Sequence, residues 1–273
     1  TDPIDIDEDF NNGLPESWTV INNNGDSYTW QYDNEGYGIY GSNCVAIQTW
    51  DDQPFSADDY LVSPKITVNE GDVLSFLASS SDADYPDSFT IFASKTEVKP
   101  SAFSITVGSE EGVPAFYRKY QYVLTDNENI SAGDEIYLAV YCNSDGFFLN
   151  LDNFRVGEYR PPKFERAYSV NENTIEVIYD IPVSQNDVNL SDIVLSGTMD
   201  IAFNNFAIHE NEPAIVFFTD PSETINPDLI LDSMKNTGLD ESVEFYAGIS
   251  PVSYTSLTNP DGHLQEGYFA SFK

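Results

Sequence analysis

The chain has 273 residues, of which 41% are hydrophobic and 14% aromatic, enough apolar material for one large or two ordinary domains. This composition excludes a wholly disordered chain. Its 46 acidic residues outnumber 11 lysines and arginines and give a formal net charge of -35, which repels phosphates and anionic lipid headgroups and so argues against nucleic-acid partners.

The N-terminal residues, TDPIDIDED (Thr1–Asp9), are polar and acidic and resemble the tether that follows a cleaved export signal. We therefore predict an exported protein at the cell surface, at the outer membrane or outside the cell. An N-terminal lipid anchor upstream of this tether is compatible with that prediction. No run approaches the roughly 18 consecutive apolar residues that a membrane helix needs, so we predict no integral membrane segment.

Runs of alternating, β-branched or aromatic residues recur along the chain and predict an all-β fold. They are Tyr60–Val68, Val73–Ala78, Ser88–Ser94, Lys119–Leu124, Ile136–Tyr141 and Phe148–Val156. Segments rich in Gly, Asn, Asp and Pro separate these runs, which is typical of a β-sandwich rather than of βαβ units. Only Pro227–Gly238 (PDLILDSMKNTG) predicts a short helical turn.

A domain boundary is predicted at GEYRPPKF (Gly157–Phe164). Two consecutive prolines cannot continue a hydrogen-bonded ladder, and they stiffen the chain as a semi-rigid linker would. We therefore predict one domain over residues 1–158 and a second over residues 159–273.

Four segments of the first domain, in order, resemble the cleaved-adhesin, or choice-of-anchor J, family. They are EDFNNGLPESWTVINNNGD followed by Trp30, DDYLVSPKI (Asp58–Ile66), DADYPDSFTIFASKT (Asp82–Thr96) and FFLNLDNFRV (Phe147–Val156). The resemblance implies a jelly-roll domain of a secreted bacterial adhesin, of the kind found in the haemagglutinin regions of gingipain-type proteases. It also implies a Bacteroidetes-type source.

The second domain resembles bacterial immunoglobulin-like modules in its opening, NENTIEVIYDIPV, which leads to DIVLSG. The segments DIAFNNFAIHE, PAIVFFTD and VEFYAGIS would supply further strands. The resemblance implies a second β-sandwich and says little about function, because such modules share architecture more than activity.

Calcium is the cofactor that the sequence favours, because it binds oxygen ligands on loops. The loop NNNGDS places Asn22, Asn24 and Asp26 at alternate positions. The family resemblance implies a structural calcium held near the first and last strands and in this loop. The implied ligands are Glu8, Asn24, Asp26, Asp59 and Asp152. Asparagines replace acids of the family pattern at positions 11, 22 and 24, which predicts weaker binding, and the alternative is that these residues only form turns.

The loop SSDADYPDS brings Asp82, Asp84 and Asp87 together beside Tyr85. It could hold a second ion, present an exposed specificity surface, or be a solvated acidic turn. Solubility alone also accounts for many acids of an exported protein.

Aromatic residues mixed with acids and glycines predict a ligand surface, since flat rings stack on sugar faces while nearby carboxylates bind hydroxyls. Such segments are YDNEGYGIYG, with Tyr32, and TWDDQPF, with Phe55. The predicted ligand-binding residues are Tyr37, Tyr40, Trp50 and Tyr85. Aromatics of a sandwich also fill its core; we assign Trp18 and Trp30 to the core, and the family resemblance favours a structural role for Trp50 as well.

Cys44 and Cys142 lie in strand-like runs, and their spacing matches no zinc motif. They either pair as a disulfide or remain buried thiols. No H-E-x-x-H, G-x-S-x-G or phosphate-binding glycine loop is present, and His209 and His263 lie in no recognisable motif.

These features predict a non-catalytic surface adhesin that binds a host or environmental macromolecule, protein or glycan. One alternative is a surface glycan-binding protein for polysaccharide uptake, which requires an exposed aromatic platform. The other is an enzyme accessory or hydrolase, which requires paired carboxylates in a deep cleft.

Overall fold

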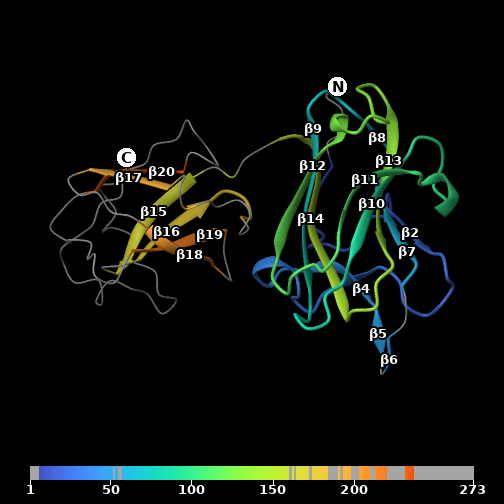
Figure 1. Cartoon of the computed structure of the whole chain (residues 1–273), viewed down its shortest axis with the longest axis horizontal. Helices are drawn as coiled ribbons and strands as arrows, with labels where there is room; N and C mark the ends of the chain where they lie inside the picture. The colour runs from blue at the N-terminus through green and yellow to red at the C-terminus, as the bar shows by residue number, and fades with distance from the viewer. Residues whose placement is uncertain are drawn as a thin grey trace. The chain divides into compact units, whose positions relative to one another are not determined.

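The computed structural model describes residues 6–51, 53–54, 57–159, 162, 164–171, 174–183, 190, 193–197, 203–209, 213–219 and 231–236. The chain divides into two compact units, Thr1–Tyr159 and Arg160–Lys273. Strands are the main regular elements among the described residues of each unit (Figure 1). The helical elements among the described residues are single 3-10 turns, η1 (Ile39–Gly41), η2 (Pro100–Ala102) and η3 (Leu124–Asp126). No helix in this part of the chain is long and apolar enough to span a membrane.

The first unit is a jelly-roll β-sandwich of two antiparallel six-stranded sheets, which confirms the predicted fold of this region (Figure 1). One sheet has the order β12-β9-β14-β4-β3, with β1 paired to β14. Its strands are β1 (Ile6–Glu8), β3 (Gln31–Asp33), β4 (Cys44–Gln48), β9 (Asp72–Ser80), β12 (Arg118–Val123) and β14 (Phe148–Glu158).

The other sheet has the order β11-β10-β13-β7-β2, with β8 paired to β13. Its strands are β2 (Thr19–Asn22), β7 (Asp59–Val62), β8 (Ile66–Thr67), β10 (Phe89–Ser94), β11 (Ile105–Glu110) and β13 (Glu135–Cys142). A small pair, β5 (Trp50–Asp51) and β6 (Gln53–Pro54), extends from one end of the sandwich (Figure 1).

The core lies between the two sheets and follows from the two-residue period of the strands. In β9, Leu74, Phe76 and Ala78 all belong to the central buried cluster. Trp18 and Trp30 belong to the same cluster, as predicted. The Trp18 ring packs edge-on against Phe10 and Phe154, an arrangement that aromatic quadrupoles favour.

One strand prediction in the first unit needs correction. The run Tyr60–Val68 forms two strands, β7 and β8, because Pro64 has no amide hydrogen for the ladder. The Ser63 hydroxyl accepts a hydrogen bond from the Leu138 amide at this break. Strand β11 was not predicted, because its sequence, ITVGSE, contains a glycine. In the structure none of its residues is fully buried.

The second unit contains a four-stranded sheet of order β15-β16-β19-β18 and a two-stranded sheet of β17 and β20. The strands are β15 (Phe164–Asn171), β16 (Thr174–Tyr179), β17 (Ile193–Gly197), β18 (Phe203–Ile208), β19 (Ala214–Thr219) and β20 (Leu231–Asn236). Strands were predicted in the segments that form β18 and β19. The VEFYAGIS segment lies outside the described residues, and the immunoglobulin-like assignment stays a prediction.

The predicted helical turn in Pro227–Gly238 is wrong where the structure describes it, because Leu231–Asn236 is strand β20. This strand pairs with β17, with Met234 opposite Leu195. Pairing between distant segments outweighs weak local helix propensity, which the sequence pattern alone cannot reveal.

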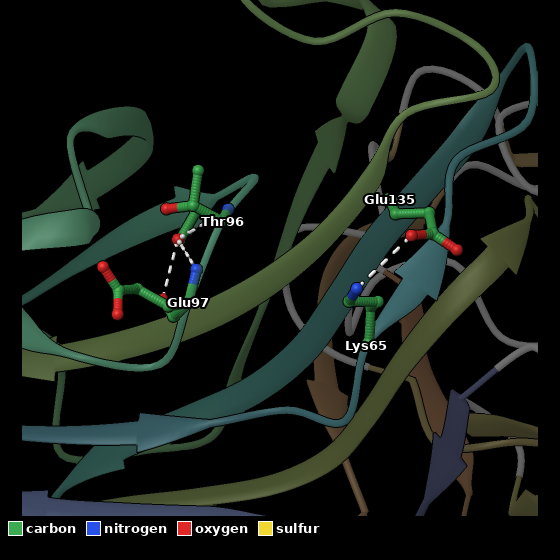
Figure 2. A network of polar contacts seen from close by, with 5 residues as sticks. Lys65, Thr96, Glu97 and Glu135 are labelled. Carbon is green, nitrogen blue, oxygen red and sulfur yellow. Dashed lines mark hydrogen bonds and ion pairs between the residues drawn. The ribbon is translucent and has the colours of Figure 1, made fainter.

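Several basic side chains of the first unit are held in ion pairs on its surface. The Lys65 ammonium lies 3.3 Å from Glu135 Oε2, beside the start of β13 (Figure 2). Lys95 pairs with Asp134 at 2.7 Å in the turn that precedes β13. Such exposed pairs contribute little stability, but they place positive charge at the end of β13 opposite Cys142.

Candidate functional site

A pocket of ≈ 240 Å³ lies at the end of the sandwich that carries β5 and β6. Its lining comes from three separate segments: β5, the loop between β9 and β10, and the loop between β13 and β14. The lining residues are Trp50, Asp82, Tyr85, Gly146 and Phe147. The pocket therefore joins two of the predicted ligand-binding residues, Trp50 and Tyr85, with one acid of the predicted specificity loop.

Aromatic rings form much of the pocket wall. The Trp50 and Phe147 rings meet edge to face, with centroids 5.9 Å apart. The Phe148 ring packs in the same way against Phe147, at 4.9 Å. Tyr85 is 63% exposed. A half-buried pair of rings facing an exposed tyrosine offers apolar contact area to a ligand.

The fully buried Asp87 carboxylate connects the segments that line the pocket. Its Oδ1 accepts hydrogen bonds from Thr49 Oγ1 at 2.7 Å, from Ser144 Oγ at 2.6 Å and from the Gly146 amide at 3.3 Å. Its Oδ2 accepts the Phe147 amide at 3.1 Å. One side chain thus ties all three pocket segments together, because Thr49 precedes β5 and Asp87 itself ends the β9–β10 loop.

Gly146 is required by close packing at the same place. A β-carbon on Gly146 would lie 2.6 Å from the Tyr85 carbonyl oxygen and 2.8 Å from Asp87 Oδ1. Contacts below 3 Å cannot be relieved by a flexible side chain when one of the atoms belongs to the backbone. The absence of a side chain here lets the pocket loop lie directly against Asp87.

The interpretation of the Asp82–Asp87 loop as a solvated acidic turn is wrong for Asp87. This carboxylate is buried and accepts hydrogen bonds from the Thr49 and Ser144 hydroxyls. Asp84 is exposed as expected, and its amide donates to Asp82 Oδ1 at 2.8 Å. Sequence reasoning also missed Gly146 and Phe147 as pocket residues. A Ser-Asp-Gly turn directly before two phenylalanines was the available signal.

Tyr37 and Tyr40, the other two predicted ligand-binding residues, do not line this pocket. Tyr37 is 57% exposed, and its carbonyl oxygen accepts a hydrogen bond from the Tyr117 hydroxyl at 2.8 Å. Tyr40 lies in η1 with a left-handed φ of 56° and is half-buried. Their role in ligand binding stays a prediction.

Asp59 carries the strongest indication of a cation site among the predicted metal ligands. It is fully buried, and its Oδ1 has no hydrogen-bond partner among the described residues. Its pKa is raised to about 6, mainly by burial and to a smaller extent by the carboxylates of Asp26 and Asp58, while hydrogen bonding from the Asp58 amide opposes the shift. The Thr29 hydroxyl lies near enough to lower this pKa, but its position does not meet hydrogen-bond geometry.

The predicted loop ligands Asn24 and Asp26 stabilise a turn, and Asp26 lies close enough to Asp59 to raise its pKa. Asn24 Oδ1 accepts the Asp26 amide at 3.2 Å, and Asp26 Oδ1 accepts the Tyr28 amide at 2.7 Å. Asn22 Oδ1 accepts the Gly25 amide at 2.7 Å. These three residues therefore form the turn that the sequence left open as an alternative. The second carboxylate oxygen, Asp26 Oδ2, accepts a hydrogen bond from the side-chain amide of Asn24.

The predicted ligands Glu8 and Asp152 lie in a second place, where β1 pairs with β14. Asp152 Oδ2 accepts the Ile39 amide and the Ser42 hydroxyl, both at 2.9 Å, and Oδ1 accepts the Asn153 amide at 2.7 Å. Burial raises the pKa of Asp152 to about 6 despite these bonds. Glu8 Oε1 accepts the Phe10 amide at 2.9 Å, and burial raises its pKa.

The five predicted metal ligands thus fall into two groups rather than one site. Within the part of the chain that the structure describes, no three Asp, Glu, His or Cys side chains are close enough to form a metal cluster by themselves. The Asp59 group fits calcium better, because it has an unpaired buried oxygen, whereas protein donors already engage both oxygens of Asp152. The metal assignment stays a prediction.

Neither cysteine of the first unit is an activated nucleophile. Cys44 and Cys142 are buried free thiols, and burial raises the pKa of each to about 12. A thiol of this kind is inert, because the thiolate is the reactive form. His209 follows β18 and its amide donates to the Ala214 carbonyl at 2.9 Å, as expected for a strand-edge residue.

Residues 4–156 match a family model described as Cleaved Adhesin Domain. Hemagglutinin A of Porphyromonas gingivalis is 26% identical over an alignment of 192 residues that covers 63% of this chain and 7% of that protein. Gingipain R1 of Porphyromonas gingivalis is 31% identical over 105 residues, 36% of this chain and 6% of that protein. The K3 cleaved adhesin domain of Lys-gingipain from the same species aligns with a TM-score of 0.48 and 24% identity, over 56% of this chain and 98% of that domain. The chain spans under a tenth of the length of these two curated relatives.

Proposed function

The chain belongs to the Cleaved Adhesin Domain family through residues 4–156, and from this premise we propose that it is an exported, non-catalytic surface protein that captures a macromolecular ligand. The ligand binds the first unit at the pocket of Trp50, Tyr85 and Phe147. The second unit is an immunoglobulin-like spacer in this proposal.

The observation that carries the proposal is the construction of the pocket. The exposed Tyr85 side chain borders a cavity that the rings of Trp50 and Phe147 also line. Buried hydrogen bonds to Asp87 hold the three contributing segments in place before any ligand arrives. Such preorganisation reduces the entropy lost on binding.

A calcium ion at the Asp26–Asp59 group has a structural role in the proposed function. Asp59 Oδ1 and the Asp26 carboxylate would bind it. The side-chain amide oxygen of Asn24 and the Thr29 hydroxyl would add to an oxygen shell of the kind calcium prefers. The bound ion supplies positive charge that offsets the buried Asp59 carboxylate. This site secures the Asn22–Tyr28 loop against β7 and takes no part in any reaction.

Capture of ligand by the purified full chain tests the proposal. Immobilised protein is probed with host-cell extracellular proteins and with a glycan array, and binding is compared for Tyr85→Ala, Trp50→Ala and Tyr37→Ala. We expect the two pocket variants to lose about tenfold or more in affinity, while Tyr37→Ala, an equally exposed tyrosine outside the pocket, keeps it. Capture that is unchanged in both pocket variants would contradict the proposal.

A glycan is the second candidate ligand, for a protein that serves polysaccharide uptake. The specific observation in its favour is that aromatic rings and the Asp82 carboxylate line one cavity. Rings can stack on a pyranose while a carboxylate accepts its hydroxyl hydrogens. Binding to the glycan array with no protein capture would support this candidate.

A further inference from the structure

We propose that the pocket of Trp50, Asp82, Tyr85 and Phe147 recognises a cationic group, the lysine or arginine side chain of a protein ligand. This inference rests on the proposed function and names the chemistry of its ligand. It starts from what lines the pocket: aromatic rings and one carboxylate, with Gly146 completing the wall.

The rings supply the first attraction. A cation over an aromatic face is drawn by the negative side of the ring quadrupole, most strongly for tryptophan. Trp50, Phe147 and Tyr85 come from three segments and border one cavity, so a single ammonium or guanidinium group can contact more than one ring. The long methylene stem of lysine or arginine suits the apolar part of such a wall.

The Asp82 carboxylate supplies the second attraction. Its Oδ1 accepts the Asp84 amide, and none of the ion pairs found among the described residues involves Asp82. A carboxylate without a protein cation at the edge of an aromatic pocket is a partner for a charged hydrogen-bond donor.

The surrounding charge decides between a cationic side chain and a neutral sugar. The three segments that form the pocket, residues 49–54, 81–87 and 143–148, contain no lysine or arginine. They carry Asp51, Asp52, Asp82, Asp84, Asp87 and Asp145. The Lys65 and Lys95 ion pairs lie near the start of β13, and the pocket loop follows its end. Uncompensated negative charge attracts a cation and does nothing for an uncharged pyranose.

Three small probes test the inference on the full chain. They are Nα-acetyl-lysine methylamide, the same compound with its ε-amine acetylated, and methyl β-glucopyranoside. The readout is the NMR shift of the Trp50 indole N–H, assigned with Trp50→Phe. Trp18 and Trp30 are 7% and 2% exposed and serve as internal references that should not shift.

We expect the charged lysine probe to bind about tenfold or more tightly than its acetylated counterpart, and its affinity to fall as salt is added. Asp82→Asn should weaken the charged probe by about tenfold and leave the acetylated probe unchanged. The matched control is Glu70→Gln, which removes the same charge from an exposed position just before β9, at the strand end away from the pocket. Unchanged thermal melting of Asp82→Asn excludes a folding defect.

Equal affinity for the charged and acetylated probes, or tighter binding of the glucoside, would overturn the inference. A lysine probe that leaves the Trp50 signal unmoved would also overturn it. None of these three results contradicts the proposed function if Tyr85→Ala still loses macromolecular capture. Capture that survives Tyr85→Ala and Trp50→Ala removes the proposed function itself, so the two failures are distinguishable.

Discussion

Two buried aspartates near Cys142, Asp87 and Asp59, are equally hidden from solvent but differ in what surrounds them. Asp87 accepts four hydrogen bonds from protein donors. Asp59 accepts one from the Asp58 amide at 3.2 Å, and its other oxygen has no partner among the described residues. A buried charge is costly unless it is paired or hydrogen-bonded. The charge of the Asp87 carboxylate is therefore stabilised by protein donors alone, whereas the Asp59 carboxylate requires a bound cation or a proton.

The largest expected effect comes from deleting the satisfied carboxylate. Asp87→Ala leaves buried donors of Thr49, Ser144 and the pocket backbone without acceptors, which should lower the free energy of unfolding by about 4 kcal/mol. Urea denaturation of the full chain in chelator is the measurement. Asp59→Ala under the same conditions should cost far less or even stabilise, since it removes a charge that lacks partners. Similar losses for both variants would break the comparison.

Calcium should act on Asp59 and not on Asp87. At a calcium concentration of about 100 Kd, the free energy of unfolding of the first unit should rise by about 2.7 kcal/mol. Asp59→Asn should remove this gain, and Glu70→Gln should retain it. The transition of the second unit should not move with calcium. Thermal melts with calcium and with chelator decide, and identical curves for the first unit over a wide calcium range would argue against the cation site.

Gly146→Ala tests how closely the pocket loop depends on Asp87. The new β-carbon would meet the Tyr85 carbonyl and Asp87 Oδ1 below 3 Å. Overpacking against backbone should cost about 2 kcal/mol and displace the loop that carries Phe147. A fluorescence change at Trp50 together with reduced stability is the expected result. Gly133→Ala is a suitable contrast, because backbone strain at its φ of 91° is its only penalty, with no atom within 4 Å.

The pH dependence of the calcium-free protein gives a further test of the comparison. The pKa of Asp59 is raised from 3.8 to about 6 by burial, so the folded state binds more protons than the unfolded state between these values. Its contribution to stability therefore grows as the pH falls from about 6 to about 4. In chelator, Asp59→Asn should show a weaker gain over this range than the parent chain. Parallel stability curves for the two proteins would refute the assignment.

The strand pattern and the family of the first unit could be predicted from sequence because both depend on local order along the chain. In β10 the alternate residues Phe89, Ile91 and Ala93 are the buried ones, as the sequence pattern predicts, whereas nearly every residue of β9 is buried. The exceptions have physical reasons: Pro64 interrupts a continuous apolar run, and β20 exists through its pairing with β17. The candidate site was predicted less completely. Trp50 and Tyr85 were named, but nothing in the sequence indicated that they share a cavity from which Tyr37 is absent.

The sequence by itself determined the all-β character, the excess of negative charge and the identity of the acids available to bind a cation. Only the tertiary structure decided which acids are buried and which are satisfied. Asp82, Asp84 and Asp87 stand within six residues of each other, yet only Asp87 is buried. The reason is that its donors, from Thr49 to Phe147, arrive from segments far away in the chain. Hydrogen bonds between distant segments form only when the fold closes, and so no local pattern records them.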